Sequence, residues 1–200
     1  MRTVIDQATR AFDSFDYATA LQVIEDSFWS FCDHYLELVK LRSYAEEDTP
    51  GRRSALATLS WTLGAFLRLL APFVPFVTEE VWSWRFADDG RPSVHTADWP
   101  VIAEVEAVPH PDHEETYQAA VEVLTVIRGT KTKAQKSLRW LVSNLEIRGS
   151  ERHREALSPV LEDVLRAGNV AADGVTVSDG MGLEGQRFEV IVELADEMPE

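Results

Sequence analysis

The sequence has little that would place it outside the cytoplasm or in a membrane. Its one cysteine, Cys32, cannot form a disulfide within the chain, which fits a reducing compartment. The longest apolar stretch, residues 63–70, is interrupted by Arg68 and is too short to cross a bilayer. Asp6 follows Met1 closely with no apolar region between them, so we expect no secretory signal. We therefore expect a cytoplasmic protein without a membrane partner.

Patterns that carry catalysis or nucleotide binding are also missing. The sequence has no GxGxxG, no P-loop and no nucleophile elbow. Cys32 and His34 lie two residues apart on an expected helix, so their side chains diverge, and no second cysteine completes a metal site. Residues 110–114, HPDHE, can ligate zinc in principle, but the proline and the loop setting favour an ordinary helix entry. We expect no catalytic residue, metal or cofactor in this chain.

What the sequence does contain predicts a folded and largely helical protein. Hydrophobic residues make up 45% of the 200, and six tryptophans and nine phenylalanines argue against disorder. Apolar side chains recur at three- and four-residue spacings over residues 16–44, which predicts one long amphipathic helix. Residues 53–70 are apolar on most faces and predict a second, central helix. A third long helix is expected from residues 112–115 to about Arg139.

Prolines and capping residues mark the break after the second helix. Pro72 and Pro75 each lack an N–H and disfavour helix in the residue before them. Thr78 has the chemistry of an N-cap, and the two glutamates that follow it would complement the positive end of the next helix. Residues 101–112 contain two prolines and little periodicity, so they predict a connector.

The pattern changes after Trp140 to short alternating segments. Three of them predict strands, and the last, FEVIVEL, does so most clearly: residues 141–147, 174–177 and 188–194. Residues 151–167 predict a helix that is divided near Pro159. Gly168 and Asn169 tolerate positive φ and would end that helix.

These patterns divide the chain into two expected parts. A helical bundle occupies residues 1–139, and a small α+β subdomain occupies residues 140–200. The expected fold class is therefore mainly α, and no internal repeat is visible.

The charge of the chain is unevenly distributed. A net charge of −15, from 19 basic and 34 acidic residues, taken alone speaks against a nucleic-acid-binding protein. However, no acidic residue occurs from Val123 to Leu145, and this window holds five basic residues: Arg128, Lys131, Lys133, Lys136 and Arg139. An acidic body with one basic strip suits a protein that binds a polyanion in one orientation. The alternative is that the strip is an ordinary solvated helix face.

The expected third helix would present this strip on one side. At about 100° per residue, Arg128, Lys136 and Arg139 cluster opposite an apolar stripe, with Lys131 and Lys133 at the flanks. Such a face would release counterions from phosphates, so its binding should weaken steeply with salt. Within the same helix, a glycine at position 129 allows close approach of a backbone or marks a kink. The adjacent tryptophan at position 140 is either a base-stacking platform or a core residue.

Several motifs together resemble one family. Residues 67–82, LRLLAPFVPFVTEEVW, followed by Ser93-Val94-His95 and Trp99-Pro100, resemble the bundle motif of valyl-tRNA synthetases. Further upstream, Phe28-Trp29 and Phe31-Cys32-Asp33 are similar to the first anticodon-domain helix of that family. Ile127-Arg128, followed by two lysines, is similar to its next basic helix. The resemblance covers nearly the whole chain and implies an anticodon-binding helical bundle followed by a small α+β subdomain.

The resemblance also implies a function. The chain would bind the anticodon arm of a valine-accepting tRNA and position it for a catalytic core elsewhere in the parent synthetase. The H-I-G-H-type and K-M-S-K-S-type motifs of such enzymes are absent, so we expect no activation of valine by this chain alone. ATP would be required only by the full-length enzyme. The alternative is an acidic docking module, a truncated paralogue without autonomous tRNA binding.

The expected tRNA contacts are basic side chains in two groups. The first group is the strip itself: Arg128, Lys131, Lys133, Lys136 and Arg139. The second group lies near the ends of the first two helices: Lys40, Arg42, Arg52 and Arg53.

Overall fold

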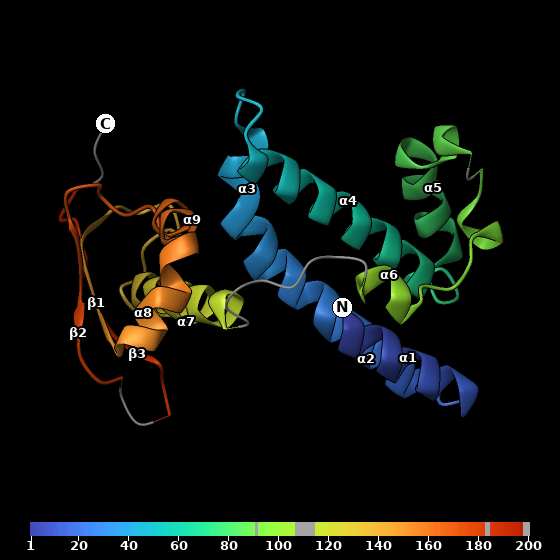
Figure 1. Ribbon diagram of the computed structural model, residues 1–200, viewed down its shortest axis with the longest axis horizontal. Coiled ribbons are helices and arrows are strands. Elements are labelled where there is room, and N and C mark those ends of the chain that lie inside the picture. Colours follow the sequence, from blue (N-terminus) through green and yellow to red (C-terminus); the bar gives the residue numbers. More distant parts are fainter. Residues whose placement is uncertain (91, 107–114, 183–184, 198–200) are drawn as a thin grey trace. The chain divides into compact units, whose positions relative to one another are not determined.

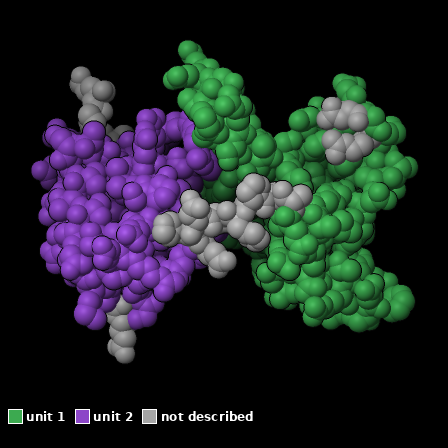
Figure 2. Space-filling view, viewed as in Figure 1, with its two compact units in different colours: residues 1–36, 43–109 green, residues 37–42, 110–200 purple. Residues whose placement is uncertain are grey.

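The computed structural model describes residues 1–90, 92–106, 115–182 and 185–197. It divides into two compact units (Figure 2): unit 1 is residues 1–36 with 43–109, and unit 2 is residues 37–42 with 110–200. The third long helix falls in unit 2, whereas the sequence predicts it as part of the bundle. The mainly α fold class with a small α+β part is confirmed.

Unit 1 is a helical bundle. It contains α1 (Arg2–Asp13), α2 (Tyr17–Ser30), α4 (Pro50–Leu70), α5 (Pro75–Arg85) and α6 (Ile102–Glu106). In Figure 1, α1 packs along α2, and α4 packs against both α2 and α5. The main core of the unit comes from three of these helices: Ile5, Ala8, Ile24, Phe66 and Leu69 are all buried.

The first predicted helix is confirmed as a continuous helical segment. It consists of α2, the π-helical turn η1 (Phe31–Tyr35) and α3 (Leu36–Tyr44), part of which belongs to unit 2. The Asp16 side chain caps its start by accepting a hydrogen bond from the Thr19 backbone N–H at 3.1 Å. The helix before it, α1, was not predicted. It ends at Asp13, and Phe15 in the turn beyond it adopts a left-handed conformation (φ 60°) that leads the chain into α2.

The cap predicted for the helix after the proline break is wrong. α5 begins at Pro75, whose fixed φ suits the first helical position, so Thr78 lies one turn inside the helix. The Thr78 hydroxyl donates to the Val74 carbonyl oxygen at 3.0 Å and is buried. After α5 come the short turns η2 (Ala87–Asp89) and η3 (Val94–Thr96). The predicted connector at 101–112 contains α6, and its last six residues lie outside the described ones.

Unit 2 contains a three-stranded sheet in its described part. β1 (Val142–Gly149) is central, β2 (Val175–Asp179) pairs with it in parallel, and β3 (Phe188–Leu194) pairs with it antiparallel. The crossover from β1 to β2 is helical, as predicted, and is divided near Pro159 into three pieces: α8 (Glu151–Leu157), η4 (Ser158–Val160) and α9 (Leu161–Ala167). All three predicted strands are confirmed within two residues.

The core of unit 2 lies between the sheet and its helices. Val123 and Ile127 of α7 (Thr116–Lys133) are buried with Leu145 and Ile147 of β1. α7 ends at Lys133, whereas the sequence predicted a helix to about Arg139. Of its expected start at 112–115, residues 112–114 lie outside the described residues, and α7 begins at Thr116. Among those residues, no helix has both the length and the hydropathy needed to cross a membrane.

Candidate nucleic-acid interface

The basic segment, residues 128–139, comprises the last turns of α7 and the chain just beyond it. Lys133 is the final residue of α7, and Lys136 and Arg139 follow in the turn; all three side chains are exposed. In the described part of the chain, none of the three forms an ion pair with a carboxylate. Their charges are therefore available to a polyanion.

Lys131 does not belong to that exposed set. Its side chain is only 1% exposed, and its ammonium donates to the carbonyl oxygens of Gly168 at 2.6 Å and Leu138 at 2.9 Å. Burial, together with the smaller effect of the positive charge of Arg128, lowers the pKa of Lys131 to about 8. The sequence predicts that Lys131 contacts a phosphate, but a side chain held inside the unit cannot present its charge to RNA without leaving these two acceptors.

Gly129 and Trp140, for each of which the sequence allows two interpretations, have defined surroundings in the structure. α7 runs without interruption through Gly129, where a Cβ would meet nothing within 4 Å, so no part of this chain requires a glycine there. Trp140 is partly buried, and its indole N–H donates to the Ala195 carbonyl oxygen at 2.7 Å. The Lys136 ammonium lies 3.8 Å from the Trp140 ring centroid. A base could stack on that ring face only by displacing Lys136.

The second group of predicted contacts is accompanied by acidic side chains. Lys40 lies 3.1 Å from Glu37, and Arg42 lies 3.2 Å from Asp163. Burial raises the pKa of the Asp163 carboxyl, and the charge of Arg42 opposes that shift. In unit 1, Arg53 and Arg52 share one carboxylate at 2.8 and 4.0 Å, that of the aspartate at position 48. These four cations are thus partly neutralised, unlike Lys133, Lys136 and Arg139.

In unit 1, the structure brings the separate pieces of the sequence motif together. The Glu79 carboxylate accepts hydrogen bonds from the Ser93 hydroxyl at 3.0 Å and from the Val94 backbone N–H at 2.9 Å. Trp99 donates from its indole N–H to the Thr9 hydroxyl of α1 at 2.9 Å. The motif is therefore a set of mutual contacts that fixes the turn after α5 and joins it to the first helix.

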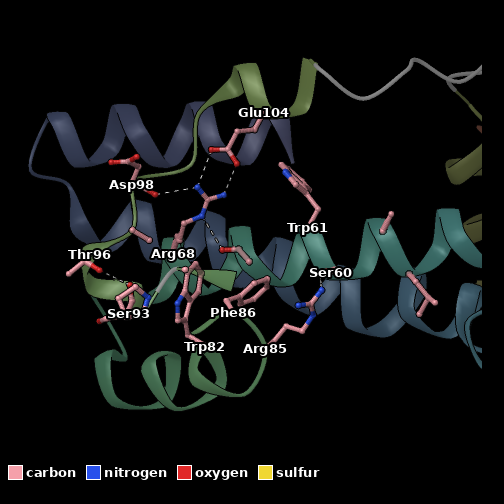
Figure 3. Close-up of a pocket in the computed structure, with 16 residues that line it drawn as sticks. Ser60, Trp61, Arg68, Trp82, Arg85, Phe86, Ser93, Thr96, Asp98 and Glu104 are labelled. Atoms are coloured by element: carbon pink, nitrogen blue, oxygen red, sulfur yellow. Dashed lines mark hydrogen bonds and ion pairs between the residues drawn. The ribbon is translucent and has the colours of Figure 1, made fainter. Parts of the chain in front are cut away.

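A cavity of about 760 Å³ lies within unit 1, between α4, α5 and the segment that follows η3 (Figure 3). At its wall, Arg68 forms two hydrogen bonds with Glu104, at 2.7 and 3.0 Å, and donates to the Asp98 carbonyl oxygen at 3.2 Å. The hydrogen bonds from Arg68 hold the pKa of the Glu104 carboxyl below its usual value. Arg85 donates to the Ser60 hydroxyl at 3.2 Å. Because Arg68 is neutralised by Glu104, this cavity is a poorer anion site than the basic segment.

Neither unit shows an arrangement for catalysis among its described residues. No group of three His, Cys, Asp or Glu side chains is placed to hold a metal ion there. Burial raises the pKa of the Cys32 thiol, which disfavours the reactive thiolate. The possible zinc ligands at 110–114 lie outside the described residues.

Comparison with known proteins decides the family. A family model described as the anticodon-binding domain of tRNA ligase matches residues 1–146. The chain belongs to this family of anticodon-binding domains. The matched region includes the entire basic segment and extends into β1, so the three exposed cations lie within the family domain.

The named relatives of this chain indicate which tRNA ligases it resembles. The chain is 42% identical to the valine–tRNA ligase of Salinispora arenicola over 182 residues, which cover 84% of this chain and 21% of that protein. It is 48% identical to the valine–tRNA ligase of Cutibacterium acnes over 149 residues, or 74% and 16% of the two chains. The predicted resemblance to the anticodon-binding region of valyl-tRNA synthetases is confirmed. The chain spans about a fifth of the length of the curated relatives it matches.

Proposed function

We propose that this anticodon-binding domain binds the anticodon arm of a valine-accepting tRNA. The observation that carries the proposal is the exposed set of Lys133, Lys136 and Arg139, none of which pairs with a carboxylate among the described residues, within a family domain whose described function is anticodon binding. The names of the relatives support valine tRNA as the ligand. Phosphate contacts of this kind position an RNA, whereas contacts with unpaired bases specify its sequence.

In the parent synthetase, this binding would place the acceptor end of the tRNA in a catalytic core that lies outside this chain. The rest of that synthetase is then the second partner, and ATP and valine would bind there. The same proposal implies a cytoplasmic location, because tRNA is aminoacylated and used in translation there. No chemical step is assigned to this chain.

The direct test is a salt titration of binding. The chain should bind a valine-accepting tRNA more tightly than an isoleucine-accepting tRNA, with an affinity that falls steeply as salt rises. The triple variant K133E/K136E/R139E should weaken binding on the order of 100-fold and flatten the salt slope by roughly two to three. The proposal would be contradicted if the unaltered chain did not bind the tRNA at low salt, or if the unaltered chain and the triple variant had equal salt slopes.

A matched control separates local contacts from net charge. The variant R10E/R152E/R166E changes the net charge by the same amount, at exposed arginines that pair with carboxylates outside the basic segment. Its salt slope should remain close to that of the unaltered chain, because surface ion pairs of this type contribute little and these arginines release no phosphate counterions. If both triple variants lose binding equally, long-range repulsion rather than the basic segment determines the affinity.

A further inference from the structure

The basic segment leaves the end of α7 through a specific hydrogen-bonded turn. Gln135 adopts a left-handed conformation (φ 54°), the Lys136 N–H donates to the Lys131 carbonyl oxygen at 2.9 Å, and the Gln135 N–H donates to that of Thr132 at 3.0 Å. This pair of bonds is the Schellman arrangement of a helix C-terminus. Lys136 and Arg139 are therefore presented by a defined turn rather than by the helix face that the sequence predicted.

α9 ends in the same way. Asn169 is left-handed (φ 48°), and the N–H groups of Val170 and Asn169 donate to the carbonyl oxygens of Leu165 and Arg166 at 3.0 and 3.1 Å. The helix end leaves its last carbonyl groups, including that of Gly168, in need of donors from elsewhere.

Two side chains join these turns. The Lys131 ammonium bridges the carbonyl oxygens of Gly168 and Leu138, and the Asn169 side-chain amide donates to the carbonyl oxygen of Arg139 at 2.7 Å. Two consecutive carbonyl groups of the basic segment, at 138 and 139, are thus held by side chains that contribute no exposed charge. Without those donors, the Leu138 and Arg139 carbonyl oxygens would lose these partners, and the turn would gain conformational freedom.

We propose that Lys131 and Asn169 are positioning residues for RNA binding: they fix the backbone that carries Lys136 and Arg139, and Lys131 itself contacts no phosphate. This inference rests on the proposed function. A turn that is already ordered loses less conformational entropy when it binds, so loosening it should weaken binding even though every exposed cation remains. We expect a loss of about tenfold in tRNA affinity for each of the two residues.

Two variants test the residues separately. N169G removes the side-chain hydrogen bond to the Arg139 carbonyl oxygen without changing any charge, and glycine accepts the left-handed conformation without strain. K131M keeps most of the aliphatic stem but removes both hydrogen bonds that the ammonium donates to the Leu138 and Gly168 carbonyl oxygens. K133M is the matched control, because it deletes an exposed lysine of the same helix turn that makes no such bond. For each variant, tRNA affinity, its salt slope and amide hydrogen exchange over residues 134–141 are measured, with overall stability followed by calorimetry.

The expected pattern differs among the three. N169G and K131M should both speed exchange in residues 134–141 and weaken binding, whereas K133M should flatten the salt slope by roughly one without speeding exchange. If N169G binds as tightly as the unaltered chain while K131M behaves like K133M, Lys131 is a phosphate contact and the inference is overturned. If N169G only lowers thermal stability and leaves affinity unchanged, the role is merely structural. N169G keeps the test decisive should K131M fail to fold.

Failure of the proposed function gives a distinct result. In that case the unaltered chain does not bind tRNA at low salt, which overturns the proposed function together with the RNA part of this inference. The exchange measurement still decides whether Lys131 and Asn169 order the turn, because it requires no RNA.

Discussion

The Glu79 carboxylate accepts a hydrogen bond from the Val94 backbone N–H at 2.9 Å, and the same oxygen accepts one from the Ser93 hydroxyl. This contact explains why a glutamate on α5 and a Ser-Val-His turn 14 residues later belong to one motif. Glu79 lies beyond the first turn of α5, which contains no acidic residue, so it does not complement the positive end of that helix as the sequence predicts. It fixes the start of η3, whose Val94 is buried in unit 1.

Replacement of Glu79 by alanine should therefore destabilise unit 1. Removing a charged acceptor leaves a partly buried N–H and hydroxyl without their partner, so we expect a loss of about 1–3 kcal/mol in the free energy of unfolding. Urea denaturation provides the measurement. The neighbouring variant E80A is the control, since the Glu80 carboxylate accepts an exposed hydrogen bond from Trp84 and its loss should cost less than about 0.5 kcal/mol. Equal effects of the two variants would contradict this role for Glu79.

The pairing of Arg68 with Glu104 should make stability depend on acid pH. Arg68 lowers the pKa of Glu104 in the folded chain below its usual 4.5, so the stabilisation is complete above that value and is lost as pH falls through the folded pKa. At neutral pH, E104Q should be less stable than the unaltered chain by about 1–3 kcal/mol. The difference between the two should shrink as denaturation curves are recorded at successively lower pH below 4.5. A difference that does not change with pH would refute the assignment.

Much of the fold could be predicted because the signals are local. The apolar spacing over residues 16–44 and the alternation over residues 188–194 each describe a face that must be buried, and the structure buries those faces. The end of α7 could not be predicted in this way. A helix usually ends where a glycine accepts the left-handed conformation, but here Gln135 adopts it, and nothing in the local sequence marks that position.

The site was predictable only in part for a similar reason. Charge patterning identified the basic segment, but it could not separate the buried Lys131 from the exposed Lys133 two residues later. That difference depends on the Gly168 carbonyl oxygen, 37 residues away in the chain. The Arg68–Glu104 pair was hidden likewise, although an arginine inside an apolar helix already indicated that some acidic partner or acceptor must exist.

Alanine at position 129 should stabilise the chain. Gly129 lies in the interior of α7, and an added Cβ would meet nothing within 4 Å, so the higher helix propensity of alanine should contribute about 1 kcal/mol. The control is Gly168→Ala, where the Cβ would lie 3.0 Å from both Ile127 and the Val164 carbonyl oxygen and should destabilise. Thermal unfolding of both variants tests this. A G129A variant that is more stable yet binds tRNA more weakly would show that the RNA backbone approaches α7 at this point.

Glycine at position 135 should also stabilise the chain, for a different reason. Gln135 holds a left-handed conformation that is unfavourable by about 1–2 kcal/mol for a residue with a Cβ, and glycine removes that cost while gaining freedom in the unfolded state. We expect a net gain of about 1 kcal/mol for Q135G by chemical denaturation. Q135V is the contrasting variant, because a β-branched residue tolerates positive φ poorly and should destabilise. Equal stability of the two variants would mean that the turn does not constrain this residue.

The lowered pKa of Lys131 gives the chain an unusual alkaline response. The folded value of about 8 lies below the ordinary 10.5, so between these values the unfolded chain holds more protons than the folded one. Because stability rises with pH wherever the unfolded state binds more protons, the free energy of unfolding should rise from pH 8 to 10.5 relative to K131M, by at most about 1.4 kcal/mol per pH unit. Subtracting the K131M curve removes the titration of all other groups. A difference that stays flat, or falls, over this range would show that the two carbonyl acceptors hold Lys131 charged despite its burial.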